Sequence, residues 1–364
     1  MKVVATMDSF KGSLTSLEAG NAVRRGILKV CPDAVVTVLP LADGGEGTID
    51  AIAPFVNGIS RTVTVTGPLG SPVCASYVYS SVNGTAYIEM AKASGLTLVE
   101  KDKRNPLIST TYGVGELMKD AIERGVRKLV ICIGGSATND GGAGMLQALG
   151  ARLTDSSGND IYKGAAGLKD LHSVDLTELI GRDTTITVAS DVTNPLCGPD
   201  GASFIYGPQK GASLEECREM DRWLEHYASI TGFDPYGKGT GAAGGMSFAL
   251  KNILGAQIRS GADMVMEITG TEPEIKGCNI VITGEGRMDS QTVNGKAPFK
   301  ILKLAQKYNK PVYGITGILG DGYEECLKAG FSRIIPLINP TMVTEDAVRS
   351  MEETAAAVFA DYLS

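Results

Sequence analysis

Apolar and polar residues follow a repeated order along this chain: a short β-branched run, a glycine-rich or polar loop, and a segment with apolar residues at helical spacing. The first instance is the clearest. Residues 3–7 predict a strand, residues 8–13 a loop, and Thr15-x-x-Glu18 a capping box that starts a helix. The apolar residues of that helix are Leu17, Ala19, Val23 and Ile27. This order predicts α/β units with parallel strands.

Six further apolar runs predict strands in the same setting. Four of them precede loops that combine glycine with polar side chains, and the last two are expected to be buried. The expected strands are residues 34–39, 128–133, 184–190, 279–283, 311–316 and 333–337. The fold class that we predict is therefore α/β, with mainly parallel sheets.

One region departs from this order. Residues 62–90 alternate between polar and apolar side chains and contain Asn83-Gly84, a strong signal for a β-hairpin. An antiparallel segment suggests a second domain of different topology, and 364 residues are enough for two domains. We predict that an α/β domain of residues 67–275 is inserted into another one, made of residues 1–66 plus 276–364.

Composition narrows the possible partners. The 34 basic and 41 acidic residues give a net charge of −7, which argues against nucleic acid and membrane surfaces as partners, because both require a basic face. Seven scattered cysteines without a C-x-x-C pair favour reduced thiols over disulfides or structural zinc. No leader-like N-terminus and no apolar run of membrane-spanning length is visible, so we expect a cytoplasmic protein.

Five loops place glycine beside acidic, hydroxyl or lysine side chains near the ends of expected strands. Ligands of open α/β sheets bind beyond the carboxyl ends of strands, and helices that begin there offer N–H groups to phosphate. In the first loop Lys11, Ser9 and Ser13 suit a phosphate or a carboxylate, although an ordinary solvated turn also explains them. In the second loop Asp43 and Glu46 suit magnesium or a polyol hydroxyl, or simply a helix N-terminus.

The third and fourth loops each follow an expected strand. Residues 134–144 are dense in glycine, which is costly in entropy unless the backbone must approach a ligand closely. We therefore favour a functional loop over a structural turn. Asp191 stands at the end of the strand 184–190, where it suits a general base or a metal ligand, and equally an Asx-turn.

The fifth loop, residues 283–292, is followed by Gly295 and Lys296. It carries Arg287 and Asp289 close to that lysine. Phosphoryl transfer mainly requires positive groups on the phosphates, a metal ion, and an acid near the attacking hydroxyl. This loop offers residue types suited to each of these requirements.

Two segments match nucleotide-binding motifs in part but lack the neighbouring residues or strand that those motifs require. Residues 232–238 read G-x-x-x-x-G-K, but Gly239 follows where a P-loop needs Ser or Thr, and no strand precedes them. Residues 239–244 match G-x-G-x-x-G but also lack a preceding strand. A tight glycine turn before a helix at residues 246–258 explains this segment better.

Together the loops resemble the type I glycerate kinase family, and the similarity covers nearly the whole chain. The motifs are DSFKGS at 8–13, ADGGEGT at 42–48, GGSATNDGGAG at 134–144, DVTNPLCG at 191–198, YGPQKGA at 206–212, GTGAAGGM at 239–246 and TGEGRMDSQT at 283–292 with GK at 295–296. The resemblance implies transfer of the ATP γ-phosphoryl group to D-glycerate, with Mg²⁺, by two α/β domains around a central cleft. The expected product is 2-phosphoglycerate, with 3-phosphoglycerate as the alternative.

On this resemblance the candidate residues take hypothetical roles. Asp289 or Asp191 accepts the proton of the glycerate hydroxyl, and both are candidate ligands of Mg²⁺. Lys11, Arg287 and Lys296 hold the substrate carboxylate or stabilise the transferring phosphoryl group. Further expected substrate contacts are Ser9, Ser13, Asp43 and Glu46. The residues expected to cradle the nucleotide phosphates are Gly134, Gly135, Ser136, Thr138, Asn139 and Asp140.

Two other functions compete with this one. An NAD-dependent dehydrogenase of a small hydroxy acid needs a strand before residues 239–244 and an acid about 20 residues further on, and Asp263 alone does not meet that requirement. A non-catalytic sensor of sugar phosphates would bind its ligand without turning over ATP, and no DNA-binding or partner module in the sequence supports it. The oligomeric state is left open.

Overall fold

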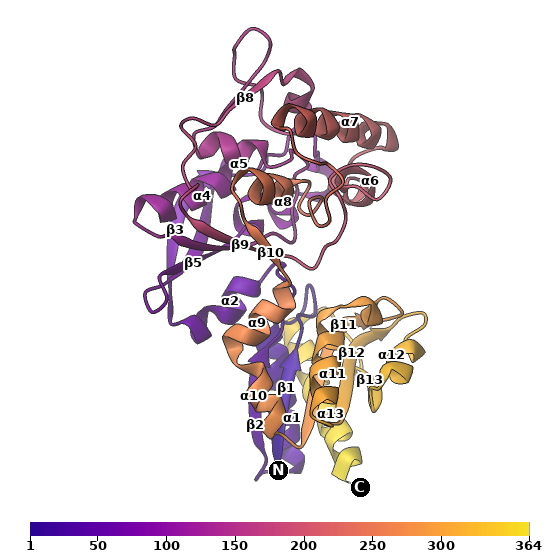
Figure 1. Cartoon of the computed structure of the whole chain (residues 1–364). Helices are drawn as coiled ribbons and strands as arrows, with labels where there is room; N and C mark the ends of the chain where they lie inside the picture. The colour runs from indigo at the N-terminus through magenta and orange to yellow at the C-terminus, as the bar shows by residue number, and fades with distance from the viewer. Residues whose placement is uncertain (364) are drawn as a thin grey trace. The chain divides into compact units, whose positions relative to one another are not determined.

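The computed structural model describes residues 1–363 and divides by its internal contacts into two compact units (Figure 1). Unit 1 comprises Met1–Asp43, Asp50–Phe55 and the chain from Ala262 onward. Unit 2 comprises Gly44–Ile49 and Val56–Gly261. In sequence, the long segment of unit 2 therefore lies between the N-terminal and C-terminal parts of unit 1.

Unit 1 is built on a five-stranded sheet in which all neighbours are parallel, in the order β13-β12-β11-β1-β2. Its strands are β1 (Lys2–Met7), β2 (Val35–Pro40), β11 (Ile280–Met288), β12 (Val312–Leu319) and β13 (Arg333–Pro336). Its helices are α1 (Ser16–Val30), α9 (Gly261–Thr269), α10 (Thr271–Gly277), η7 (Thr292–Asn294), α11 (Ala297–Lys307), α12 (Glu324–Ala329) and α13 (Thr344–Leu363). The chain crosses between the units within α2 (Thr48–Ile52) and η1 (Ala53–Val56).

Helices cover both faces of this sheet, because alternate residues of its inner strands are apolar on both sides. Val3, Ala5 and Met7 of β1 belong to a core cluster with residues of α1 and α13. Val4 belongs to a second cluster with residues of α10, α11 and α12. Both faces of β1 are therefore buried, as expected of an inner parallel strand.

Unit 2 is built on a six-stranded mixed sheet in the order β10-β9-β6-β5-β4-β3. The first four strands are parallel, and β4 pairs antiparallel with both β5 and β3. Its strands are β3 (Gly58–Thr66), β4 (Pro72–Ser80), β5 (Thr85–Glu89), β6 (Lys128–Cys132), β9 (Thr185–Ala189) and β10 (Gln257–Arg259), with a separate pair β7 (Arg152–Thr154) and β8 (Ser173–Asp175).

Most helices of unit 2 contribute to one apolar core that they share with this sheet. They are α3 (Ala91–Ser94), α4 (Tyr112–Glu123), α5 (Ala143–Ala148), η4 (Ala165–Asp170), α6 (Ala202–Tyr206), α7 (Leu214–Thr231), α8 (Met246–Phe248) and η6 (Ala249–Ile253). The short helices η2 (Leu96–Leu98), η3 (Lys101–Lys103) and η5 (Pro208–Lys210) lie outside this core.

Most of the expected elements are confirmed. The capping box is present, because the Thr15 side chain accepts from the Glu18 amide while the Glu18 carboxylate accepts from the Thr15 amide. The Asn83-Gly84 turn joins the antiparallel strands β4 and β5, with Gly84 at a φ of 67°. The α/β class and the mainly parallel sheets are confirmed with them.

Several boundaries differ from the expectation. The chain leaves unit 1 before residue 66, because β3 pairs along its whole length with β4 and so belongs to unit 2. It returns at Ala262, before residue 276, because Ala262 and Ile275 pack into the core of unit 1.

Three elements also differ from the sequence prediction. Strand β11 continues to Met288, so the first part of the expected loop 283–292 is strand. Strand β13 lies at the sheet edge and is only partly covered, not buried. The helix expected at 246–258 ends at Ile253, because β10 follows.

Candidate active site

The carboxyl ends of β1 and β11 bring two acids side by side in unit 1. Met7 is paired with Gly284 in the parallel register, so the next residues on the two strands, Asp8 and Glu285, are neighbours. The Asp8 amide donates to the carbonyl of Gly284 at 2.8 Å, which fixes this register at the strand end. The sheet therefore positions both carboxylates at the edge where ligands of parallel sheets bind.

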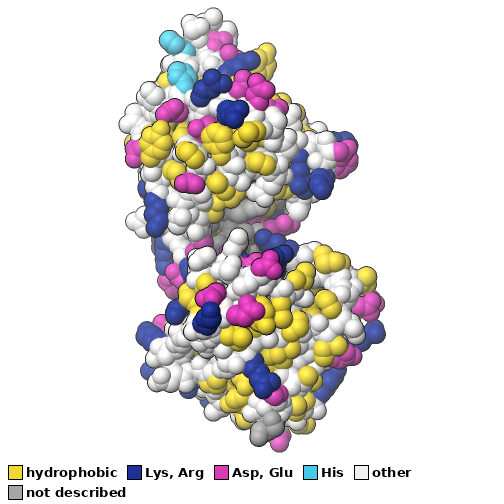
Figure 2. Space-filling model, turned by 90° about the vertical axis from the view of Figure 1, so that its right-hand side faces the viewer, with side chains coloured by type: hydrophobic (Ala, Val, Ile, Leu, Met, Phe, Trp, Pro, Cys, Tyr) yellow, Lys and Arg dark blue, Asp and Glu magenta, His cyan; other side chains and the backbone are white. Residues whose placement is uncertain are grey.

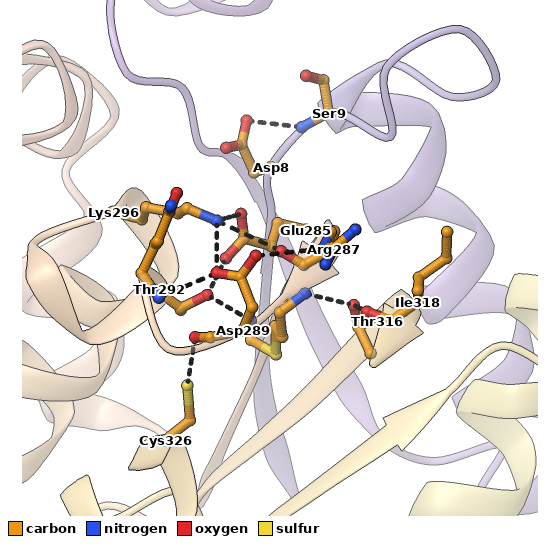
Figure 3. A network of polar contacts seen from close by, with 12 residues as sticks. Asp8, Ser9, Glu285, Arg287, Asp289, Thr292, Lys296, Thr316, Ile318 and Cys326 are labelled. Carbon is orange, nitrogen blue, oxygen red and sulfur yellow. Dashed lines mark hydrogen bonds and ion pairs between the residues drawn. The ribbon is translucent and has the colours of Figure 1, made fainter. Parts of the chain in front are cut away.

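Lys296 is the centre of a polar network at this edge (Figure 3). Its ammonium Nζ lies 3.2 Å from Glu285 Oε2 and 3.5 Å from Asp289 Oδ1. Arg287 Nε lies 3.2 Å from Asp289 Oδ2. The strand β11, the segment that follows it and the start of α11 thus gather the predicted residues Arg287, Asp289 and Lys296 around one further acid.

The pKa values of the two acids in this network are shifted in opposite directions. Burial raises the pKa of Glu285, although Lys296 and the Thr292 hydroxyl, which donates to Oε1 at 2.8 Å, oppose that shift. For Asp289 the effect of burial is outweighed by the Gln291 amide, Lys296 and Arg287, so its pKa is lowered. Asp289 is therefore a carboxylate held by cations, a poor proton acceptor at neutral pH.

Asp8 has the opposite character to Asp289. Burial, together with the negative charges of Asp43 and Glu285, raises the pKa of Asp8 to about 7, while the Ser9 amide and Lys11 oppose the shift. The Ser9 amide donates to Asp8 Oδ1 at 2.7 Å. Asp8 was not among the residues predicted from the sequence, although it directly follows a buried strand, the signal used for Asp191.

The loop after β1 carries the other predicted residues of unit 1. The Ser13 hydroxyl donates to the Phe10 carbonyl at 3.0 Å, so it stabilises the turn of the loop. Lys11 is exposed, and its charge acts on Asp8. Asp43, after β2, also acts on Asp8. Within unit 1 the structure therefore brings the predicted residues Ser9, Lys11 and Asp43 into the surroundings of Asp8.

In unit 2 two glycine loops meet at the carboxyl ends of β6 and β9. The Gly134 amide donates to the Gly44 carbonyl at 3.1 Å, and a side-chain carbon on Gly134 would lie 2.5 Å from the Cα of Gly45. Gly44 has a φ of +87°, and a side-chain carbon there would lie 2.6 Å from the carbonyl oxygen of Ala189. Close packing of backbone on backbone therefore accounts for part of the glycine density in both loops.

The second half of the loop 134–144 lies in the interior of unit 2. The Asp140 carboxylate accepts from the Thr111 amide at 2.8 Å, the Thr111 hydroxyl at 2.9 Å, the Gly142 amide at 3.1 Å and the Gly144 amide at 3.3 Å. Burial raises the pKa of Asp140, and these hydrogen bonds oppose the shift. Asp140 therefore anchors the loop internally.

Lys210 is a buried cation behind the same loop. Its Nζ donates to the Thr138 carbonyl at 2.6 Å. Burial lowers the pKa of Lys210 to about 7, against the attraction of Asp140. The Asn139 amide donates to the Ser203 hydroxyl at 2.8 Å. The side chains of Thr138, Asn139 and Asp140 are fully buried, so their placement argues against the nucleotide contacts that the sequence predicted.

Asp191 lines a pocket of about 750 Å³ in unit 2. The polar lining residues include three basic side chains, Lys238, Lys251 and Arg259, beside Thr193. These basic residues lie in separate segments of the sequence, so no local motif predicts them and only the fold brings them together. Glu46 lies beside the first half of the glycine loop, since a side-chain carbon on Gly135 would be 3.9 Å from its Cβ.

Three types of feature are absent from the described residues. Among residues 1–363 no group of three or more His, Cys, Asp or Glu side chains is placed to hold a metal ion. None of the helices in that part of the chain is long and apolar enough to cross a membrane. The segment before the G-x-G-x-x-G match forms turns, so the strand that a dinucleotide site needs is missing there.

Both units thus place polar and charged side chains at the carboxyl ends of parallel strands. Unit 1 offers cations among acids, and unit 2 offers a glycine loop and a basic pocket. The fold and these sites define an α/β protein suited to anionic small-molecule ligands.

Comparison with known proteins is specific. A family described as the glycerate kinase family matches residues 3–362. A glycerate 2-kinase of Escherichia coli K12 is 46% identical over 96% of this chain and 93% of its own length. A glycerate kinase of Bacillus subtilis 168 is 44% identical over 99% of this chain and 97% of its own. A crystal structure described as glycerate kinase 2 of Salmonella typhimurium LT2 is 44% identical, with a TM-score of 0.86 over 100% of this chain and 98% of that one.

The chain belongs to the glycerate kinase family. Its activity is that of a glycerate kinase, and as a kinase it uses ATP. The resemblance found in the ordered motifs is confirmed by these comparisons.

Proposed function

We propose that the chain transfers the γ-phosphoryl group of ATP to the C2 hydroxyl of D-glycerate, with 2-phosphoglycerate and ADP as products. Support for the position of transfer comes from the Escherichia coli relative, which is named a glycerate 2-kinase. The 3-hydroxyl is the alternative acceptor.

The observation that carries the assignment of the acceptor site is the cluster at the carboxyl ends of β1 and β11. Lys11, Arg287 and Lys296 supply positive charge there beside carboxylates, from three separate positions on unit 1. Glycerate carries a carboxylate, which a lysine or arginine binds through charge-assisted hydrogen bonds. We assign the binding of glycerate and the stabilisation of the transferring phosphoryl group to these residues, with Ser9 as a further polar contact.

For the nucleotide we favour the pocket of unit 2 beside Asp191. Its volume of about 750 Å³ lies within the roughly 300–1,000 Å³ typical of ligand pockets. Lys238, Lys251 and Arg259 balance the charge of phosphate groups. Of the predicted loop 134–140, the backbone of Gly134 and Gly135 is the part that is not fully buried, so close approach of phosphate is assigned to these two glycines and not to residues 138–140.

Mg²⁺ is expected to enter with ATP. Since no cluster of three potential protein ligands occurs within residues 1–363, the ion would be held by one carboxylate together with phosphate oxygens and water, a common arrangement for Mg²⁺. Asp191 is suited to be that carboxylate because it lines the basic pocket. Asp289 fits it poorly, because Arg287 and Lys296 already lie against its two oxygens.

Two further expectations stay predictions. On the face of the described residues shown in Figure 2, basic and acidic side chains are interspersed, which agrees with a small-molecule substrate and no nucleic-acid partner. The seven cysteines are free thiols, which agrees with a reducing compartment such as the cytoplasm. The central cleft implied by the resemblance also stays a prediction.

The test is an ADP-release assay with purified protein, Mg²⁺ and ATP, run with D-glycerate, with L-glycerate and without acceptor. Phosphorus NMR of the product then identifies the phosphorylated carbon. We expect turnover that depends on D-glycerate and a signal from 2-phosphoglycerate. A 3-phosphoglycerate product would overturn the position of transfer, and turnover independent of glycerate would overturn the acceptor.

A further inference from the structure

Asp8 is an acid of this site that does not take part in the polar network around Lys296. Asp8 follows β1, the inner strand between β11 and β2, and in Figure 3 the contact drawn for its carboxylate is the one from the Ser9 amide. Glu285, its neighbour on β11, accepts from both Lys296 and the Thr292 hydroxyl. Asp289 accepts from Arg287, Lys296 and the Gln291 amide.

We propose that Asp8 is the proton acceptor for the glycerate hydroxyl, an inference that rests on the proposed function. In the transfer step the hydroxyl oxygen forms a bond to the γ-phosphorus of ATP. The bond between that phosphorus and the β–γ bridging oxygen breaks, and its electron pair stays on ADP. The hydroxyl proton passes to a carboxylate oxygen of Asp8 and later returns to water.

The geometry separates Asp8 from the two acids of the Lys296 network, Glu285 and Asp289. A carboxylate held by ammonium and guanidinium groups binds a proton weakly, and this describes Asp289. The oxygens of Glu285 are each occupied, one by the Thr292 hydroxyl and one by Lys296. Asp8 lies one strand away from these cations at the same carboxyl edge, where a bound substrate hydroxyl is reached from the sheet.

The charges around Asp8 favour the same role. The acids that face it from the neighbouring strands are Asp43 after β2 and Glu285 on β11, and the cation on its own loop is Lys11. Together with burial, the two acids raise the pKa of Asp8 to about 7. General-base catalysis is most effective when the pKa of the base lies near the working pH.

The main test is Asp8→Asn, with wild type assayed first so that loss of the proposed function is recognised separately. We expect kcat to fall by at least about 100-fold, the usual contribution of a general base, while glycerate binding measured by calorimetry is retained. Asp33→Asn, which neutralises an exposed acid of the same unit, serves as the matched control. A kcat of Asp8→Asn within about threefold of wild type would overturn the proposal, since it falls far short of that contribution.

A second measurement distinguishes proton transfer from a structural role and does not require Asp8→Asn to fold. Wild-type kcat/KM should rise with pH through about 7, because the base must be ionised. Asp43→Asn removes a charge that raises the pKa of Asp8, so this rise of kcat/KM, the acidic limb of the pH profile, should move to lower pH. Lys11→Met removes a charge that lowers it, so the limb should move to higher pH. A limb that stays in place in both variants would show that Asp8 is not the titrating group.

Discussion

The charged residues at the strand ends of unit 1 and those of the glycine loop in unit 2 follow similar sequence signals but have opposite surroundings. Lys296 has 35% of its side chain exposed, and its partner Asp289 has 15%. Lys210 and Asp140 of unit 2 are 1% and 0% exposed. The first pair can exchange partners with an anionic ligand, whereas Asp140 and Lys210 both hold the backbone of the glycine loop 134–144.

The difference shows that an acid in a glycine-rich loop after a buried strand has two quite different uses. At the sheet edge of unit 1 Asp289 and its two cations come from β11 and the segment that follows it, and they remain partly solvated. In unit 2 the second half of the loop is buried, and Asp140 accepts hydrogen bonds from the backbone amides of Gly142 and Gly144 within the same loop. Four experiments test this contrast, from the largest expected effect to the smallest.

Asp140→Ala should destabilise unit 2 severely. The change leaves the Thr111 amide and hydroxyl and two loop amides without their buried acceptor. Loss of a partner for buried polar and charged groups costs about 3–5 kcal/mol. Urea unfolding followed by the fluorescence of Trp223, the single tryptophan of the chain, reports on this unit.

Asp102→Ala, at an exposed position of unit 2, is the control for Asp140→Ala and should change the free energy of unfolding by less than about 0.5 kcal/mol. An Asp140→Ala protein as stable as this control would contradict the anchoring role and restore Asp140 as a candidate ligand-binding residue.

Lys296→Met should reduce activity with little loss of stability. Its ammonium group is the partner shared by Glu285 and Asp289, and it is partly solvated. Loss of one charge that stabilises the transition state costs about 100-fold or more in kcat/KM. Steady-state kinetics with glycerate varied measure this effect. Lys303→Met, at an exposed position of helix α11, which begins directly after Lys296, should retain full activity, and an equal loss in both variants would refute the assignment.

Asp289→Asn should have a smaller effect on catalysis than either Asp8→Asn or Lys296→Met. Because Arg287 and Lys296 lower the pKa of Asp289, we expect it to position these cations and not to accept a proton. A loss of about tenfold in kcat, roughly 1.4 kcal/mol, matches the loss of one positioning contact. The pH profile is the decisive readout: its limb near pH 7 should remain, and disappearance of the limb would make Asp289 the base.

Lys210→Met should change how the stability of unit 2 depends on pH. The pKa of Lys210 is lowered from 10.5 to about 7 by burial, so between these values the unfolded chain carries a proton that the folded chain lacks. The contribution of Lys210 to stability should therefore become more favourable as pH rises above 7, by at most about 1.4 kcal/mol per pH unit. Lys169→Met removes an exposed lysine and is the control.

For this comparison, urea unfolding of wild type and both lysine variants is followed by Trp223 fluorescence between about pH 7 and 9. The free energy of unfolding of wild type minus that of Lys210→Met should become more positive as pH rises. The same difference for Lys169→Met should stay constant. A constant difference in both would show that Lys210 is charged in the folded protein throughout this range.

Local sequence signals predicted most of the secondary structure. The capping box at Thr15 and Glu18 and the Asn83-Gly84 turn each depend on residues adjacent in the chain, and both are present. The ends of strands were less predictable where pairing with a neighbouring strand extends them. Strand β11 runs on to Met288 because β12 pairs with it up to Leu319, and no local signal records the length of a partner strand.

The candidate site was predicted in part. Arg287, Asp289 and Lys296 were found because the same short stretch of chain holds all three. Asp8 and Glu285 were overlooked, since their proximity depends on the parallel register of two strands that are far apart in sequence. The basic residues of the pocket beside Asp191 were overlooked for the same reason.

By itself the sequence determined the α/β class, the resemblance to glycerate kinases and the loops in which polar residues gather, because these follow from residue type and local spacing. Only the tertiary structure decided which of those residues are buried, which are paired and how strongly each binds a proton. Burial and charge pairing depend on groups brought together from distant segments, as Asp43 and Glu285 are around Asp8. Desolvation depends on which groups surround a side chain in space, and Coulomb energy depends on the distance between charges. Neither is determined by position along the chain.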